Sequence, residues 1–356
     1  ELLYQSVLTA QLRLSVAALW GSCPVLSLGG YPWRIGAIQE VFAMSQSRPT
    51  LSSPARECPV VDGVRQIQRI AVRNAEVGGI PINRALPTRE RRTVGAWCFL
   101  DHAGPTVFNG TSPGMDVGPH PHIGLQTFTW MIEGEVLHRD SLGSEQVIRP
   151  GQVNLMTAGR GIAHTEQSVG EQRRLHAAQL WIALPAEHAD MAPRFDHYPD
   201  LPQWQNNGVN HRLLVGEFGA YRSPVFTLSP LIAIDLEWQE AARIELPLRD
   251  DYEIGFLPLI GAFELNGETF SPDELAYLGM KNNSIGLNAQ KGSRGLLIGG
   301  APLNEEILIW WNFVGHSKAE ITRAQHDWEQ GAPRFPAVSG YSGERMTAPR
   351  LPWSDV

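Results

Sequence analysis

Short apolar runs separated by clusters of Gly, Pro, Asn and Asp dominate the chain from about Val64 onward. The runs at 125–132 and 175–184 are rich in β-branched and aromatic residues, and the second ends at Pro185. β-branched and aromatic residues favour strands, and clusters of Gly, Pro, Asn and Asp favour tight turns. The pattern predicts an all-β sandwich or barrel. Helical periodicity is rare, and we expect one short helix, over 319–330.

The strand pattern divides into two blocks of similar size, which indicates duplication of one fold, although no repeat is visible residue by residue. Between the blocks lies a polar stretch with the composition of a connector. The predicted organisation is an N-terminal extension at 1–63, a first domain at 64–185, a linker at 186–210, a second domain at 211–335 and an extended tail at 336–356.

The N-terminal extension contains an uncharged run at 14–30. A membrane helix needs about 20 strongly apolar residues, whereas glycines and a proline interrupt this run. A secretory signal would begin with basic residues, but Arg13 is the one cation that precedes the run. Because Met44 opens a polar stretch, we expect 1–43 to lie upstream of the true start and to lack stable structure.

Composition and charge narrow the function classes. The chain has 37 acidic residues against 29 Lys and Arg, a net charge of −8. No long basic run is present, so we expect neither direct nucleic acid binding nor membrane association. The three cysteines, Cys23, Cys58 and Cys98, are far apart and form no CxxC pair. We therefore expect no disulfide framework or thiolate zinc site, and a reducing compartment, the cytoplasm.

Two short motifs carry the candidate chemistry. One places His120 and His122 two residues apart, and the other places His164 and Glu166 two residues apart. In a strand, residues i and i+2 point to the same face, so each pair can aim both side chains into one barrel interior. Three imidazoles and one carboxylate form a good site for a divalent first-row metal. Imidazole suits iron, copper, nickel or zinc, and an added carboxylate with open positions favours iron that activates oxygen.

Several stretches resemble the pirins, a family within the cupin superfamily. The resemblance extends over about 64–331, and the combination of TAGRGIAHTE with a spaced HPH makes it specific. The matching stretches are PHPHIGL at 119–125, LHRDSLG at 137–143, RPG at 149–151, 156–166, 175–185 and GGAPLNE at 299–305.

The resemblance implies two tandem cupin barrels, each a double-stranded β-helix or jelly roll. It implies one non-haem Fe(II) in the N-terminal barrel, held by His120, His122, His164 and Glu166. Mn, Ni, Cu or Zn remain open as alternative metals. The C-terminal barrel has no HxH motif, and we expect it to hold no metal.

Four further residues bear on the site. Where cupins usually place a glutamate, four residues after the second histidine, this chain has Gln126, a neutral amide that is a poor metal ligand. His138 is interpreted as structural or solvent-facing. His176 and Gln179 differ by three positions, so both cannot face inward on a regular strand, and one of them could contact substrate.

The resemblance also implies a function. The leading hypothesis is a metal-dependent dioxygenase of the quercetin 2,3-dioxygenase type, which cleaves a flavonol, a small planar phenolic substrate, with O2. Glu166 is then the candidate catalytic base for the 3-hydroxyl proton. The alternative hypothesis is an iron-containing, redox-sensing regulatory protein that binds a partner protein without turnover. A zinc or manganese cupin with non-redox chemistry is a third alternative, and the four ligands alone do not separate the three.

Overall fold

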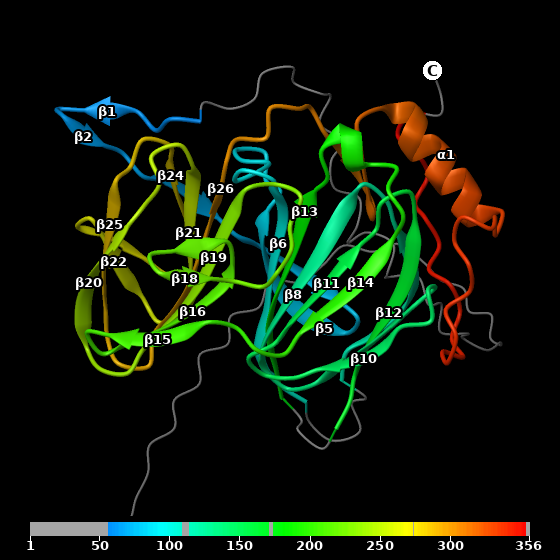
Figure 1. The fold of residues 1–356 in the computed structure, drawn as a ribbon, viewed down its shortest axis with the longest axis horizontal. Helices are drawn as coiled ribbons and strands as arrows, with labels where there is room; N and C mark the ends of the chain where they lie inside the picture. The colour runs from blue at the N-terminus through cyan, green and yellow to red at the C-terminus, as the bar shows by residue number, and fades with distance from the viewer. Residues whose placement is uncertain (1–55, 109–113, 171–173, 273, 354–356) are drawn as a thin grey trace, which may run out of the picture. The chain divides into compact units, whose positions relative to one another are not determined.

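The computed structural model describes residues 56–108, 114–170, 174–272 and 274–353 (Figure 1). The predictions for 1–43 lie outside these residues. Strands dominate the described part of the chain, and its one α-helix, α1, spans Lys318–Glu329. The all-β prediction with a short C-terminal helix is confirmed. Ser317 caps that helix, because its Oγ accepts a hydrogen bond from the backbone N–H of Glu320.

The N-terminal half consists of a seven-stranded and a four-stranded sheet. In spatial order, the large sheet contains β14 (Arg194–Tyr198), β11 (Val153–Thr157), β8 (Leu125–Glu133), β13 (Arg174–Ala183), β6 (Trp97–Val107), β5 (Ile80–Leu86) and β4 (Arg73–Val77). The small sheet contains β10 (Glu145–Ile148), β9 (Val136–Asp140), β12 (Ile162–Ser168) and β7 (Asp116–His122). All pairs between these strands are antiparallel.

The C-terminal half repeats the same plan of seven and four strands. Its large sheet contains β15 (Gln203–Asn206), β16 (Val209–Val215), β19 (Leu231–Trp238), β26 (Arg294–Gly300), β21 (Glu253–Ile260), β24 (Glu274–Gly279) and β3 (Gln68–Ala71). Its small sheet contains β20 (Ala242–Pro247), β25 (Ser284–Ala289), β22 (Phe263–Leu265) and β23 (Glu268–Phe270). The repeated plan confirms the two tandem cupin barrels.

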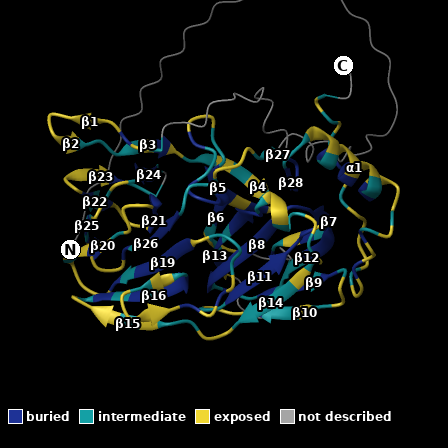
Figure 2. Cartoon of the chain, turned by 45° about the horizontal axis from the view of Figure 1, so that its top comes forward, coloured by how far each residue is buried: buried dark blue, intermediate teal, exposed yellow. Residues whose placement is uncertain are grey.

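The two large sheets share one apolar core. Alternate residues of the strands point to opposite faces of a sheet, and one face of each large sheet contributes to this core. Trp97 of β6 is fully buried there, and its indole N–H donates to the carbonyl of Gly299 on β26 over 3.0 Å. Its ring meets Phe128 edge-on, with the centroids 5.5 Å apart. Figure 2 shows this buried material on β6, β8, β13 and β19.

The interiors of the two barrels differ in chemistry. The C-terminal interior is filled by apolar side chains from both of its sheets, with Phe256 and Phe263 packed edge-on at its centre. The N-terminal interior instead carries the histidines and charged residues described below. The same fold therefore provides one solid core and one cavity whose lining combines histidine, charged and apolar residues.

Segments from the two ends of the chain cross between the halves. Strand β3 lies within the predicted first domain, yet it pairs with β24 of the C-terminal sheet. Conversely, two elements from the C-terminal part of the chain pack against the N-terminal barrel around Ile123. They are helix α1 and the hairpin of β27 (Leu308–Trp310) and β28 (Phe313–Gly315). The predicted linker also contains strands, β14 and β15, one for each large sheet. A sequence pattern identifies a strand but does not identify the strand with which it pairs. The predicted domain boundaries therefore stay a prediction.

The remaining elements are short. They are the pairs β1 (Val60–Val61) with β2 (Val64–Arg65) and β17 (Glu217–Phe218) with β18 (Tyr221–Arg222), and the 3-10 helix η1 (Ala186–His188).

Within the described ranges, no helix has the length and apolar character needed to cross a membrane.

Trp97 gives a test of the shared core. We expect Trp97→Ala to lower the free energy of unfolding by about 3–5 kcal/mol, because a large aromatic side chain is replaced by a cavity between the sheets. Denaturation in urea measures this change. Val64→Ala, at a position that is 65% exposed, is the control and should stay within about 0.5 kcal/mol. A loss below about 1 kcal/mol for Trp97→Ala would contradict the shared core.

Candidate metal centre

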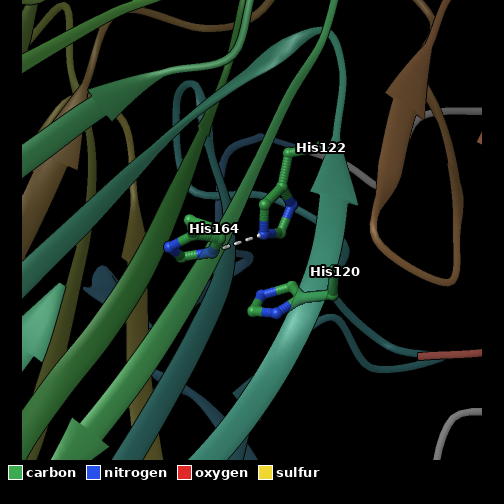
Figure 3. Close-up of side chains that lie close together, drawn as sticks. All are labelled: His120, His122 and His164. Atoms are coloured by element: carbon green, nitrogen blue, oxygen red, sulfur yellow. Dashed lines mark hydrogen bonds between the residues drawn. The ribbon is translucent and has the colours of Figure 1, made fainter. Parts of the chain in front are cut away.

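Three histidines converge inside the N-terminal barrel. His120 and His122 come from β7, and His164 comes from β12, directly opposite His120 in the antiparallel pair. The ligand nitrogens of the three imidazoles all lie within 4.8 Å of one another. Figure 3 shows the rings facing one another, with 3.1 Å between the Nε2 atoms of His122 and His164. The prediction that the two motifs meet on one interior surface is confirmed for the histidines.

An irregularity in β7 sets this register. His164 pairs with His120, whereas Glu166 pairs with Val117, so β7 contains one residue more than β12 over this interval. Pro119 lies in the interval, and it has no N–H for a ladder bond. The extra residue is a β-bulge, which re-aims side chains beside it.

Each imidazole is held through its Nδ1 atom. The Nδ1 of His120 lies 2.9 Å from the carbonyl oxygen of Gly118, and the Nδ1 of His122 lies 2.9 Å from that of Asn312. A carbonyl only accepts, so both Nδ1 atoms carry the proton. Their Nε2 atoms therefore keep a free lone pair. This tautomer is the one that a metal requires, so these residues fit a bound divalent ion.

His164 is held by a chain of side chains. Its Nδ1 lies 3.3 Å from the Nδ1 of His138, and the Nε2 of His138 lies 3.2 Å from a carboxylate oxygen of Asp140. The carboxylate accepts from His138 Nε2, so His138 Nδ1 accepts in turn from His164. The ring of His138 stacks on Phe195, with centroids 4.3 Å apart. Of the two interpretations of His138, the structure supports the structural one and excludes a solvent-facing ring.

Burial keeps the three imidazoles neutral. Desolvation lowers the pKa of His120 to about 4, opposed by its hydrogen bond to Gly118. It also lowers the pKa of His122 and His164 well below the ordinary value, and the charge of His120 acts in the same direction. Neutral rings are the form that binds metal, so the site is ready for a cation at pH 7.

Glu166 lines the same cavity as the three histidines. Burial raises the pKa of its carboxyl from 4.5 to about 7, because the charged form loses its hydration. The assignment of Glu166 as fourth ligand stays a prediction. A second carboxylate, that of Asp101, also lines the cavity.

The wall that contains Asp101 combines an ion pair with aromatic rings. Both carboxylate oxygens of Asp101 accept hydrogen bonds from Arg84 over 2.6 Å. The guanidinium of Arg84 lies 4.5 Å from the ring centroid of Phe99, which stacks on Trp181 at 4.0 Å. Both oxygens of the buried carboxylate therefore have hydrogen-bond partners, and the two opposite charges balance. Burial raises the pKa of Asp101 and Arg84 opposes that rise.

The whole cavity encloses about 470 Å³ of empty space, part of it open to solvent. Residues from several elements line it: Val77, Arg84, Phe99, Asp101, Val117, His120, His122, Thr127, His164, Glu166, Gln179, Trp181, Asn312 and Met346. Sequence reasoning missed most of this wall. The alternation that places Gln179 and Trp181 on one face could have indicated part of it. Asn312 and Met346 come from the far end of the chain and gave no signal.

The other candidate residues face elsewhere. Gln126 adjoins Thr127, which lines the cavity, so strand alternation turns Gln126 to the opposite face. Its amide donates to Thr157 Oγ1 over 2.9 Å, and none of its hydrogen bonds reaches the histidines. Of His176 and Gln179, only Gln179 lines the cavity, while His176 Nε2 lies 2.8 Å from that of His102. The expectation that the two residues point to different sides is confirmed.

Comparisons with known proteins agree with this fold. Residues 79–182 match the family model Pirin, and 233–336 match the Pirin C-terminal cupin domain. A Pseudomonas aeruginosa protein named "Putative quercetin 2,3-dioxygenase PA1205" is 54% identical over 310 residues, which are 87% of this chain and 98% of that protein. A "Pirin-like protein" of Caulobacter vibrioides is 36% identical over 271 residues, 74% of this chain and 93% of that one.

Among solved structures, the chain is similar to a crystal structure titled quercetin 2,3-dioxygenase from Acinetobacter baumannii. The TM-score is 0.79 and the sequence identity 49%, over 80% of this chain and 96% of that chain. The paired barrels, with a three-histidine site in the first, define a bicupin protein. The two family models and the Pseudomonas relative make the assignment specific: this chain belongs to the pirin family.

Glu166 gives a pH-dependent test on metal-free protein. Its folded pKa of about 7 exceeds the ordinary 4.5, so the folded state binds the proton more tightly. Its contribution to stability is complete below about pH 4.5 and is lost as the pH rises through about 7. Relative to Glu166→Gln, the wild type should lose about 2–3 kcal/mol of unfolding free energy between about pH 5 and pH 8. Denaturation in urea with a chelator measures this, and a pH-independent difference would contradict the burial of this carboxyl.

His138 gives a test of the hydrogen-bond chain behind His164. We expect His138→Phe, which keeps the ring stack on Phe195, to weaken metal binding about 10- to 100-fold, because His164 loses the acceptor for its Nδ1 proton. Competition with a chelator measures the affinity. His211→Phe is the matched control, since His211 is also buried and stacked, on Trp204, but lies in the C-terminal half. An affinity within twofold of wild type in His138→Phe would contradict the role of the chain.

Proposed function

We propose that this protein is a metal-dependent dioxygenase of the quercetin 2,3-dioxygenase type, which cleaves a flavonol with O2. One observation carries the proposal: three buried imidazoles, with ligand nitrogens within 4.8 Å of one another, converge in a cavity that Glu166 and aromatic side chains also line. Two proteins similar to this chain, at 54% and 49% identity, have quercetin 2,3-dioxygenase in their names. Fold alone would not support the activity, because cupins host many functions.

The proposed ligands are His120, His122, His164 and Glu166, and the proposed metal is one Fe(II). Three imidazoles and one carboxylate leave coordination positions open, and Mn, Ni, Cu or Zn are the alternatives. The metal would supply Lewis acidity and the means to activate O2. The protein sets the tautomers of the three imidazoles through Gly118, Asn312 and His138. Glu166 lies outside the cluster of three histidines, so its side chain would turn toward the ion on binding.

The cavity residues would orient the substrate and remove its proton. The stacked rings of Phe99 and Trp181 give a flat apolar wall against which a planar phenol can pack. The carboxylate of Glu166 would accept the proton of the 3-hydroxyl group. The buried ion pair of Arg84 with Asp101 lies in the same wall and would meet polar groups of the substrate.

We also infer a cytoplasmic location. Cys58 and Cys98, the two cysteines within the described ranges, are free and buried. Free thiols are usual in reducing compartments.

The experiment is metal analysis of protein purified without added metal, combined with O2 uptake on addition of quercetin. We expect near-stoichiometric iron, quercetin-dependent uptake and release of carbon monoxide. His122→Ala and His164→Ala should lose both metal and uptake while keeping the fold, because the core between the large sheets and the C-terminal barrel contains neither residue. His188→Ala, whose imidazole is partly exposed and lies outside the cavity, is the control.

Three outcomes would contradict the proposal or part of it. Iron without turnover would favour the redox-sensing regulator that binds a partner protein. Absence of metal would contradict both functions. Unfolding of either histidine variant, shown by circular dichroism, would contradict the independence of the core from the site.

A further inference from the structure

The hairpin β27–β28 brings a residue of the C-terminal half to the metal centre. Its two strands are joined by Trp311 and Asn312. The hairpin lies against β7, where Phe313 forms a parallel bridge with Ile123 and the N–H of Val314 donates to the Ile123 carbonyl over 3.2 Å. Asn312 is thus placed directly behind His122.

Asn312 acts there with its main chain, while the Nδ2 atom of its side chain has no partner among the described residues. Its carbonyl accepts the Nδ1–H of His122. Its side-chain Nδ2 is buried and has no hydrogen-bond partner among the described residues. The residue is 3% exposed and lines the cavity. Buried N–H groups are nearly always paired in folded proteins, so the unpaired Nδ2 of a residue that lines a cavity calls for a partner outside the protein, a water molecule or a ligand group.

The turn that positions Asn312 is held under strain. Trp311 has a φ of 53°, a conformation that a bulky residue adopts at a cost. Its ring packs edge-on against Phe313, with centroids 5.5 Å apart, and lies tilted against Trp328 of α1 at 6.5 Å. Trp328 is fixed in turn, because its indole N–H donates to the Met346 carbonyl over 2.9 Å. Strain that surrounding packing maintains is typical of functional sites.

A purely structural role does not account for these features together. The carbonyl that anchors His122 belongs to the main chain, and any residue at position 312 would supply it. An apolar side chain would fill the same volume without leaving a buried amide unpaired. The amide therefore has a use that the turn itself does not require.

We propose that the side-chain amide of Asn312 binds substrate, with Nδ2–H donating to an oxygen of a planar phenol or enol beside His122. The inference rests on the proposed function and extends it by naming a binding residue from the second domain. A neutral N–H donor stabilises a deprotonated oxygen without competing for the metal. Substrate recognition in the N-terminal barrel then depends on the C-terminal hairpin.

The test is an anaerobic titration of metal-loaded protein with quercetin, followed by the change in its absorption spectrum. Asn312→Leu keeps a similar shape and removes the amide, and Asn312→Ser is a smaller second variant in case the first does not fold. Each keeps the main-chain carbonyl that holds His122. We expect the dissociation constant to rise about 10- to 100-fold, as for a lost hydrogen bond to a charged group, with metal content unchanged. Asn154→Ala, a buried amide outside the cavity, is the matched control and should bind as wild type does.

The outcomes separate this inference from the proposed function. A dissociation constant within twofold of wild type in both variants would overturn the inference. Loss of metal from the variants would also overturn it, because the side chain would then act through His122. Wild type that binds quercetin without turning it over would contradict the dioxygenase alone, and the comparison of dissociation constants would still decide the role of Asn312. Wild type that does not bind quercetin would overturn both.

Discussion

The N-terminal site depends on one constraint: each buried imidazole must place its Nδ1 proton on a fixed acceptor so that its Nε2 atom stays free. The three acceptors come from different parts of the chain. Gly118 lies on the same strand as its histidine, His138 lies on the neighbouring strand, and Asn312 lies on a hairpin almost two hundred residues further along. Because an unpaired buried N–H is costly, these bonds couple the ligand set to the packing of the C-terminal segment.

The two barrels share one architecture but differ in their interiors, one filled and the other with a cavity. Both have a seven-stranded and a four-stranded sheet, and their large sheets pack on each other through alternate residues. In the C-terminal barrel the inward positions are apolar and fill the interior. In the N-terminal barrel several inward positions are histidine or charged, and a cavity remains between them.

Part of this arrangement could be predicted from the sequence. Strand alternation with period two is a local property, and it correctly predicts that His120, His122 and His164 share one interior surface. The same rule could have shown that Gln126 points away, because Thr127 faces the cavity. Long-range partners could not be predicted. Nothing in the sequence near Asn312 indicates which barrel its hairpin joins, and a strand such as β3 does not reveal that it belongs to the other sheet.

The most direct measurement of the central claim is anomalous X-ray diffraction from crystals of the natural, metal-containing protein, recorded on both sides of the iron absorption edge. We predict one peak in the N-terminal barrel, at about 2.0–2.2 Å from the Nε2 atoms of His120, His122 and His164 and from the Glu166 carboxylate. The peak should disappear below the iron edge. A peak bound through Nδ1 atoms, or a metal elsewhere in the molecule with these three rings free, would contradict the proposed centre.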